Sequence, residues 1–193
     1  MAIIRGVTID HATLQRWVIR LVRLIDKEVR RRKKSVGSSW RMDETYIKVK
    51  GVWMYLYRAV DSAGYTIDFL LRKNRDASAA KAFFGKAIKH NGSPQKVTID
   101  KSGSNSCALS SLNKSLAKEK QIEIRQIKYL NKIVEQDHRF IKKRTKPMLG
   151  FKSFNSAKIT ITGIENIRMI QKGQIIGGNN KLSVFENFAM LMA

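Results

Sequence analysis

The sequence contains few cysteines and few histidines, and this limits the kinds of metal site it can form. Cys107 is the single cysteine among 193 residues, which excludes an intrachain disulfide and a cysteine-rich zinc site. We expect Cys107 to pack in a core. The three histidines, His11, His90 and His138, lie far apart and show no metal-ligand spacing. Any divalent metal must therefore be bound through oxygen ligands.

Long apolar runs are also lacking. No segment reaches the roughly 18 apolar residues that cross a bilayer, and the N-terminal sequence lacks the charged-then-apolar layout of a signal peptide. We expect a soluble intracellular protein without a membrane partner or a small-molecule substrate. The apolar fraction of 43% is close to the ordinary globular value of about 45–50%. The length suits one main domain.

Acidic residues are scarce, and the excess of basic residues indicates a polyanionic partner. Lys and Arg number 38 against 15 Asp and Glu, which gives a net charge of +23. Such a charge is typical of proteins that bind nucleic acids. A membrane-surface protein or a small RNA-binding protein of ribosomal type are the alternatives that charge alone leaves open.

The first segment reads as a helix within residues 8–34, with Asp10 as its N-cap. "GVTIDHATLQRWV" resembles the second helix of a helix-turn-helix, but the partner helix expected before it is missing. An amphipathic helix that merely packs and solvates its charges is an equally open interpretation. Residues 1–38 are thus predicted to be a helical DNA-binding segment with a basic linker. Its apolar stripe and its candidate DNA contacts are Leu14, Trp17, Val18, Leu21 and Ile25, and Arg16, Arg20, Lys33 and Lys34.

From Trp40 onward the pattern changes to that of strands. Three consecutive strands, "SWRMDETYIKVK", "VWMYLYRAVD" and "YTIDFLLRK", are followed by alternating helices and strands over residues 76–145. This order predicts an α/β fold with a mixed five-stranded sheet flanked by helices, which is the layout of the ribonuclease H-like fold. We place this core at residues 39–173, with a helix or a strand over 154–173, and a C-terminal tail at 174–193 that could form a short helix.

Three of the acidic residues stand at positions where a purely structural role is less obvious. Asp43 interrupts an otherwise apolar first strand, Asp100 ends the fourth strand, and Glu135 lies in the first turns of the third core helix. If the first and fourth strands are neighbours, these carboxylates could form a cage of hard oxygen ligands for two Mg²⁺ or Mn²⁺ ions. Two such ions can drive in-line attack on a phosphodiester. Three unrelated structural acids are the open alternative.

The motifs "SWRMDETYIKVKGVWMYLYRAVD", "TIDKSGSN" and "YLNKIVEQDHRFIKKRTKP" resemble those of bacterial insertion-sequence DDE transposases of the insertion sequence six family. The resemblance extends over about residues 6–173 and implies a ribonuclease H-like core with Asp43, Asp100 and Glu135 as the catalytic, metal-binding triad. Residues 101–134 separate the last two acids, which matches the family's usual spacing. It also implies that Lys142, seven positions after Glu135, holds a DNA-end phosphate.

The other cations of this helix, Arg139, Lys143 and Arg144, are further candidate DNA contacts. A helical projection separates the helix's two acids, because Asp137 falls among apolar positions and Glu135 does not. We therefore expect Asp137 to be a partly buried, hydrogen-bonded structural group. The aromatic residues Trp40, Trp53, Tyr55 and Tyr57 could stack on bases, but their strand positions favour the core.

The hypothesis from sequence is a DNA transposase that cleaves a strand at each transposon end and joins the freed 3′-hydroxyl to target DNA. The resemblance implies DNA as the partner, through terminal inverted repeats and target, and a homo-oligomer acting on paired ends. It also implies a bacterial protein of the cytoplasm, associated with the nucleoid. The alternative is a catalytically inactive, truncated transposase that acts as a DNA-binding protein.

Overall fold

The computed structural model describes residues 2–4 and 6–192, and it divides the chain into two compact units. One unit comprises residues 35–152, and the other comprises residues 1–34 together with 153–193. The first unit contains the sheet. The second consists of helices and a short hairpin.

The sheet of the first unit has five strands in the order β5-β4-β3-β6-β7. β3 (Ser39–Val49), β4 (Val52–Asp61) and β5 (Thr66–Arg72) form an antiparallel meander, whereas β6 (Lys96–Thr98) and β7 (Glu123–Arg125) run parallel to β3. The parallel strands follow helical connections, as the right-handed crossover rule requires. The predicted mixed five-stranded fold and the pairing of the first and fourth strands are confirmed.

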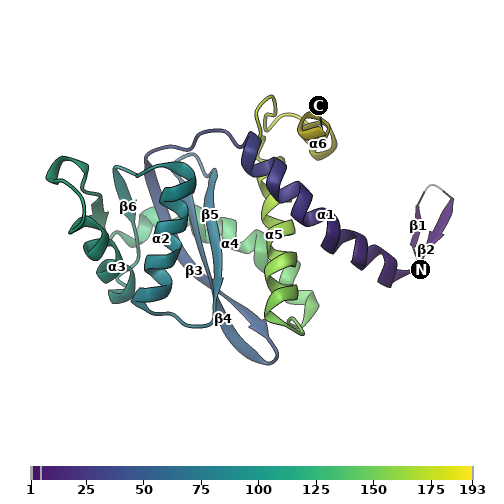
Figure 1. The fold of residues 1–193 in the computed structure, drawn as a ribbon, viewed down its shortest axis with the longest axis horizontal. Helices are drawn as coiled ribbons and strands as arrows, with labels where there is room; N and C mark the ends of the chain where they lie inside the picture. Colours follow the sequence, from purple (N-terminus) through teal and green to yellow (C-terminus); the bar gives the residue numbers. More distant parts are fainter. Residues whose placement is uncertain (1, 5, 193) are drawn as a thin grey trace. The chain divides into compact units, whose positions relative to one another are not determined.

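Helices cover both faces of this sheet (Figure 1). α2 (Ala77–Asn91) and α3 (Gly103–Asn113) pack on one face, and α4 (Lys132–Thr145) lies against β3 and β4 on the other. Asp76 caps α2 by accepting a hydrogen bond from the Ala79 backbone amide at 2.7 Å. Three short 3₁₀ helices complete the unit at Lys118–Lys120, Lys128–Asn131 and Lys146–Met148.

The aromatic residues of β3 and β4 divide into two groups. Trp40 and Tyr57 are fully buried under α2 and α3, where Tyr57 stacks on Phe83 at 6.0 Å between ring centroids. The prediction that these two belong to the core is confirmed. Trp53 is 57% exposed and Tyr55 is only partly buried, so the core prediction is wrong for Trp53. The two helices cover the base of the β3–β4 ribbon but not its tip.

The parallel register of β3 and β6 brings two distant parts of the chain level with each other. Trp40 pairs with Val97 and Arg41 with Thr98. Since paired strands advance in step, two further residues place Asp43 level with Asp100. β6 ends at Thr98, so both side chains lie at a level of the sheet where β3 is no longer paired with β6.

The segment after α4 returns to the C-terminal end of β3, near Val49. We call this end of the β3–β4 ribbon the outer end, and the end with Trp40 and Tyr57 the inner end. Phe151 exchanges backbone hydrogen bonds with β3, donating to the Lys48 carbonyl and accepting from the Lys50 amide, each at 2.8 Å. Gly150 precedes it with φ +109°, and a β-carbon there would lie 3.1 Å from the Lys48 carbonyl oxygen. A positive φ and such a close approach are both suited to glycine.

In the second unit, α1 (His11–Arg32) packs against α5 (Phe154–Gln171), and α6 (Val184–Met192) contacts both helices. The Asp10 side chain accepts a hydrogen bond from the Thr13 amide at 3.3 Å, which confirms the predicted cap. α5 resolves the helix-or-strand alternative, and α6 confirms a short helix in the tail. Residues before α1 form a hairpin of β1 (Ala2–Ile4) and β2 (Val7–Ile9), which the sequence pattern did not predict.

Two further expectations concern exposure. Cys107 is exposed on α3, so the expectation that it packs in a core is wrong. Among the described residues, no helix combines the length and the apolar character needed to cross a membrane.

Candidate active site

The carboxylates of Asp43 and Asp100 meet where β3 passes the end of β6. Together with Glu44 they form a cluster in which one oxygen from each residue lies within 4.8 Å of the others. Asp100 is fixed by its own turn, because its Oδ1 accepts a hydrogen bond from the Ser102 amide at 3.1 Å. The two strand-borne acids predicted from the sequence are therefore brought together.

Glu44 is an additional member of this cluster, and it is already bound by neighbouring polar groups. Its Oε1 accepts from Asn105 Nδ2 at 3.1 Å, and its Oε2 lies 3.4 Å from Arg75 Nη2. The same Arg75 nitrogen lies 3.3 Å from Asp100 Oδ2. One guanidinium therefore bridges two of the three carboxylates and offsets part of their mutual repulsion.

The electrostatics of the cluster favour a cation. Burial raises the pKa of Asp43 to about 7, and the negative charges of Glu44, Asp100 and Glu135 contribute to the rise. The pKa of Glu44 is also raised, mainly by burial, although Arg75 opposes the shift. A bound divalent cation would relieve this repulsion, and carboxylate oxygens are the ligands that Mg²⁺ and Mn²⁺ prefer. The residues present therefore fit such a metal.

Glu135 is exposed in the first turn of α4 and is not part of the three-carboxylate cluster. It is near enough for its charge to raise the pKa of Asp43. The helix is oriented by Asp137, two positions further on, whose Oδ2 accepts from Arg58 Nη2 of β4 at 2.7 Å. Both side chains are almost fully buried. The prediction that Asp137 is a buried, hydrogen-bonded structural group is confirmed.

His138 follows these two acids on α4 and approaches the cluster from the side of the helix. Its Nδ1 is 3.6 Å from Asp43 Oδ2. Burial lowers the pKa of His138 to about 3, and the charges of Arg58 and Lys142 contribute to the shift. The imidazole is therefore neutral at physiological pH and adds no positive charge beside Asp43.

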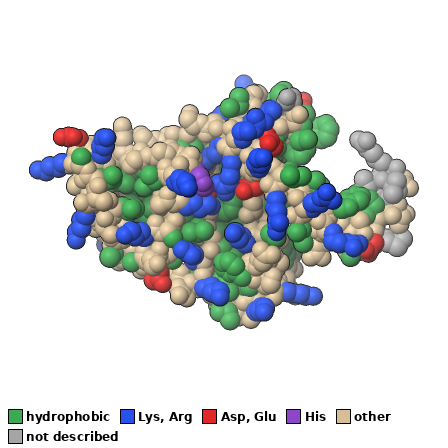
Figure 2. Space-filling model, in the orientation of Figure 1, with side chains coloured by type: hydrophobic (Ala, Val, Ile, Leu, Met, Phe, Trp, Pro, Cys, Tyr) green, Lys and Arg blue, Asp and Glu red, His purple; other side chains and the backbone are tan. Residues whose placement is uncertain are grey.

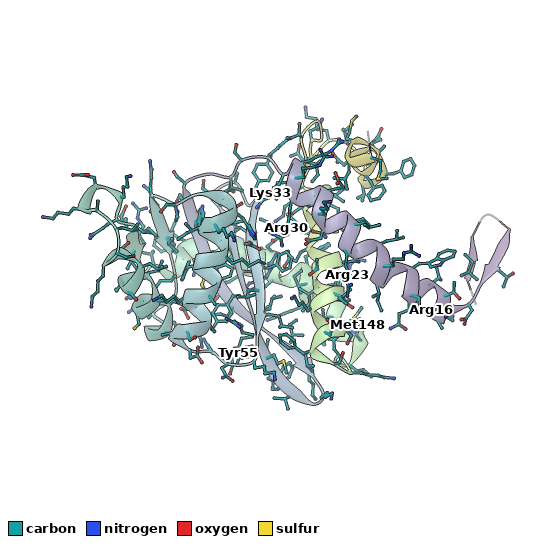
Figure 3. The ribbon with its side chains drawn as sticks, viewed as in Figure 1. Arg16, Arg23, Arg30, Lys33, Tyr55 and Met148 are labelled. Atoms are coloured by element: carbon teal, nitrogen blue, oxygen red, sulfur yellow. The ribbon has the colours of Figure 1, made fainter. Side chains whose placement is uncertain are left out.

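The predicted DNA contacts fall on both units. Arg139, Lys142, Lys143 and Arg144 are exposed on α4 of the first unit, whereas Arg16 and Arg20 are exposed on α1 of the second. Figure 3 marks Arg16, Arg23 and Arg30 along α1. Lys33 is half-buried, and the Lys34 ammonium donates to the backbone carbonyls of Gly173 and Gly178. Figure 2 shows many Lys and Arg side chains and few acids on the visible face.

Sequence reasoning did not identify Glu44, Arg75 or Asn105 as part of the site. Alternation along a strand sends Glu44 to the face opposite Asp43, and for that reason its proximity to Asp100 is not predicted. Both faces are accessible to Asp100 only because β6 ends before it reaches this level of β3. The one available signal was the adjacency of two acids in a chain with so few.

A mixed sheet of this order, flanked by helices on both faces, defines a ribonuclease H-like core. Solved structures agree on the fold. The catalytic core domain of HTLV-2 integrase in complex with magnesium matches with a TM-score of 0.54 and 17% identity, covering 70% of this chain and 89% of that one. The core domain of BIV integrase matches with a TM-score of 0.51 and 15% identity, covering 80% and 95%.

Sequence comparisons identify the family. A family model described as a DDE domain matches residues 37–174. The transposase for the insertion sequence-like element IS431mec of Staphylococcus aureus is 42% identical over 168 residues, covering 87% of this chain and 73% of that protein. The transposase of IS257 in transposon Tn4003 from Staphylococcus aureus matches to the same extent. The chain belongs to the insertion sequence six family of DDE transposases, which are integrase-like polynucleotidyl transferases.

Proposed function

We propose that Asp43, Asp100 and Glu135 bind divalent metal and that this site cleaves a strand at each transposon end and joins the freed 3′-hydroxyl to target DNA. The observation that carries the proposal is the convergence of Asp43 and Asp100 from strands whose register makes them level. Glu135 is the third ligand in this proposal because its charge already acts on Asp43.

Each residue then has a defined task. Asp43 and Asp100 would hold the metal, with Glu135 of α4 as the third ligand. Mg²⁺ or Mn²⁺, bound as two ions, would supply an activated hydroxyl nucleophile and stabilise charge on the leaving oxygen. Arg75 keeps Glu44 and Asp100 together. The neutral His138 fills the space beside Asp43.

Lysines and arginines supply the phosphate contacts of this proposal, and all of them except Lys33 and Lys34 are exposed. Lys142 lies seven residues after Glu135, about 10 Å along the same side of α4, and would hold the phosphate next to the reacting one. The remaining proposed contacts are Arg139, Lys143, Arg144, Arg16, Arg20, Lys33 and Lys34. Because an element has two ends and each chain has one such site, we propose a homo-oligomer on paired inverted repeats.

The test is a cleavage assay with purified protein, Mg²⁺ and a duplex that carries the terminal inverted repeat. We expect Asp100→Asn to lower the rate of nicking by about a thousandfold or more, because metal ions supply several kcal/mol of transition-state stabilisation. DNA binding should persist, since the substitution removes no cation. Glu119→Gln alters an exposed acid outside the site and should cleave normally.

Undiminished nicking by Asp100→Asn would overturn the assignment. Salt-sensitive binding by the unmodified protein without any nicking would instead support a catalytically inactive DNA-binding protein.

A further inference from the structure

A pocket of about 730 Å³ lies at the outer end of the β3–β4 ribbon, within the unit of residues 35–152. Its volume is within the range of about 300–1,000 Å³ of small-molecule sites. β3, β4, the end of α4 and the segment around Gly150 form its walls. Four aromatic residues and three lysines line it, and one of the aromatic residues, Phe151, is buried. The side chains available to a ligand are Tyr46, Trp53, Tyr55, Lys48, Lys142 and Lys146.

The aromatic residues form one connected cluster. The Tyr46 ring is 5.4 Å from that of Tyr55 and meets Trp53 edge-on at 6.3 Å, measured between centroids. Tyr46 and Trp53 remain about half exposed, at 49% and 57%. Figure 3 marks Tyr55 on the ribbon. Since adjacent large aromatic side chains are rarely left open to water on a surface without a function, this cluster offers flat faces to a ligand.

The lysines give the pocket a strong positive charge. Lys48 Nζ lies 5.8 Å from the centre of the Trp53 ring, while Lys142 and Lys146 approach from α4 and the turn after it. Among the described residues that line the pocket, none is acidic. The ligand should therefore be anionic as well as flat. A nucleotide meets both conditions, because every base has a face for stacking and carries a phosphate beside it.

The position of the pocket connects it to the candidate active site. Lys142 is on the pocket wall and seven residues after Glu135, so about 10 Å of helix separates them. On the other wall, Tyr46 follows Asp43 by three residues along β3, again about 10 Å. Both elements that carry proposed metal ligands therefore continue into the pocket. A DNA strand that reaches the metal site could place a neighbouring nucleotide there.

We propose that this pocket binds an unpaired nucleotide of the DNA strand adjacent to the reacting phosphate, with its base stacked on Trp53 and Tyr55 and its phosphate held by Lys142 and Lys146. The proposal rests on the proposed function, since it names the form of DNA that the site takes. Duplex DNA would have to fray to fill the pocket, because a paired base presents its edges and not its faces.

The test measures binding without catalysis. Twelve-residue oligothymidylate and an abasic oligomer of the same length would be titrated in EDTA, with fluorescence anisotropy of a labelled strand as the readout. We expect Trp53→Ala to weaken oligothymidylate binding about 5- to 150-fold, as expected for loss of one stacked base. Binding of the abasic strand, which keeps the phosphates, should change less than about twofold.

Two control variants keep the result interpretable. Trp53→Phe retains an aromatic face and should recover most of the affinity. Phe185→Ala removes an aromatic residue that is 78% exposed on α6 and should bind both strands normally. Equal losses on both strands for Trp53→Ala, or no loss on either, would overturn the proposal. So would a change in oligomeric state of Trp53→Ala by sedimentation, since it would identify the pocket as a protein interface.

Failure of this proposal can be distinguished from failure of the proposed function. A failure of the proposed chemistry appears as absence of nicking in Mg²⁺, whereas the pocket is measured in EDTA. The nicking assay and the binding assay can therefore succeed or fail separately.

Discussion

The two ends of the β3–β4 ribbon carry similar residues in different surroundings. At the inner end Trp40 and Tyr57 are fully buried beneath helices. At the outer end Tyr46 and Trp53 are half exposed beside three lysines. The strands are continuous and hydrogen-bonded through both ends. The two ends differ in whether helices pack over them, because α2 and α3 cover the inner end alone. The same residue type thus stabilises the fold at one end and is available to a ligand at the other.

The largest expected effect is a loss of folding stability at the inner end. Trp40→Ala should lower the free energy of unfolding by about 3–5 kcal/mol through the cavity it leaves, and by about 1 kcal/mol more because Trp40 Nε1 donates to the Gly37 carbonyl at 2.9 Å. Trp53→Ala should cost within about 0.5 kcal/mol, as exposed positions usually do. Urea denaturation monitored by circular dichroism measures both. Equal losses for the two tryptophans would refute the division of the ribbon.

A second prediction concerns the opposite face of the inner end, where Arg58 of β4 pairs with Asp137. Asp137→Ala should destabilise the protein by about 3–5 kcal/mol, because it leaves a buried guanidinium without its carboxylate. Glu135→Ala on the same helix should leave stability within about 0.5 kcal/mol, since Glu135 is exposed, while activity is lost. The same denaturation assay, paired with the nicking assay, separates these roles. A stability loss as large for Glu135→Ala would contradict them.

The third prediction is a pH dependence at the middle of the ribbon. The pKa of Asp43 is raised to about 7, so in EDTA its contribution to stability falls as pH rises from about 4 to about 7, because the folded state holds a proton that the unfolded state releases. Metal binding requires the ionised form. The apparent Mg²⁺ affinity should therefore be about tenfold weaker at pH 6 than at pH 8.

Thermal shifts in a Mg²⁺ titration at each pH measure this dependence. Buried His138 faces Asp43, but its pKa of about 3 keeps it neutral at both pH values. Asp43→Asn should remove the pH dependence of any residual binding. A persisting tenfold change in that variant would assign the dependence to another group.

The smallest expected effect is a change in the salt dependence of DNA binding at the outer end. Lys48 is the third lysine of the pocket and lies over Trp53, so we expect it to contact a phosphate in addition to those of Lys142 and Lys146. Lys48→Gln should then reduce the slope of log affinity against log salt for single-stranded DNA by about 0.7, which corresponds to one lost phosphate contact. Anisotropy titrations at several salt concentrations give the slope. Lys81→Gln alters an exposed lysine on α2 and provides the matched control. An unchanged slope for Lys48→Gln would place that lysine outside the DNA path.

Much of the first unit could be predicted from residue patterns. Alternation and turn residues identify all five strands, and the crossover rule makes β6 and β7 parallel. The neighbourhood of Asp43 and Asp100 follows from that order. The opposite environments of Glu135 and Asp137 follow from a helical projection, because a 3.6-residue period separates positions two apart by about 200°.

Other features depend on where elements end, which patterns do not encode. Glu44 joins the cluster because β6 stops at Thr98, and Trp53 is exposed because the core under α2 and α3 does not extend to the tip of the ribbon. Periodicity marks which side of a strand is apolar, but not how far its covering helix extends. The contacts of Arg75 and Asn105 with Glu44 could not be predicted from sequence patterns either, since each residue reaches Glu44 from a different segment.

Gly150 has a consequence for how the outer end tolerates change. Its φ of +109° and the 3.1 Å that would separate a β-carbon from the Lys48 carbonyl oxygen both disfavour a side chain at this position. The turn that closes one wall of the pocket therefore favours glycine at this position. In a library of all substitutions, position 150 should be intolerant, while Lys152, which is exposed and does not line the pocket, should accept many. Mutational tolerance, unlike affinity or stability, would thus trace the outline of the wall residue by residue.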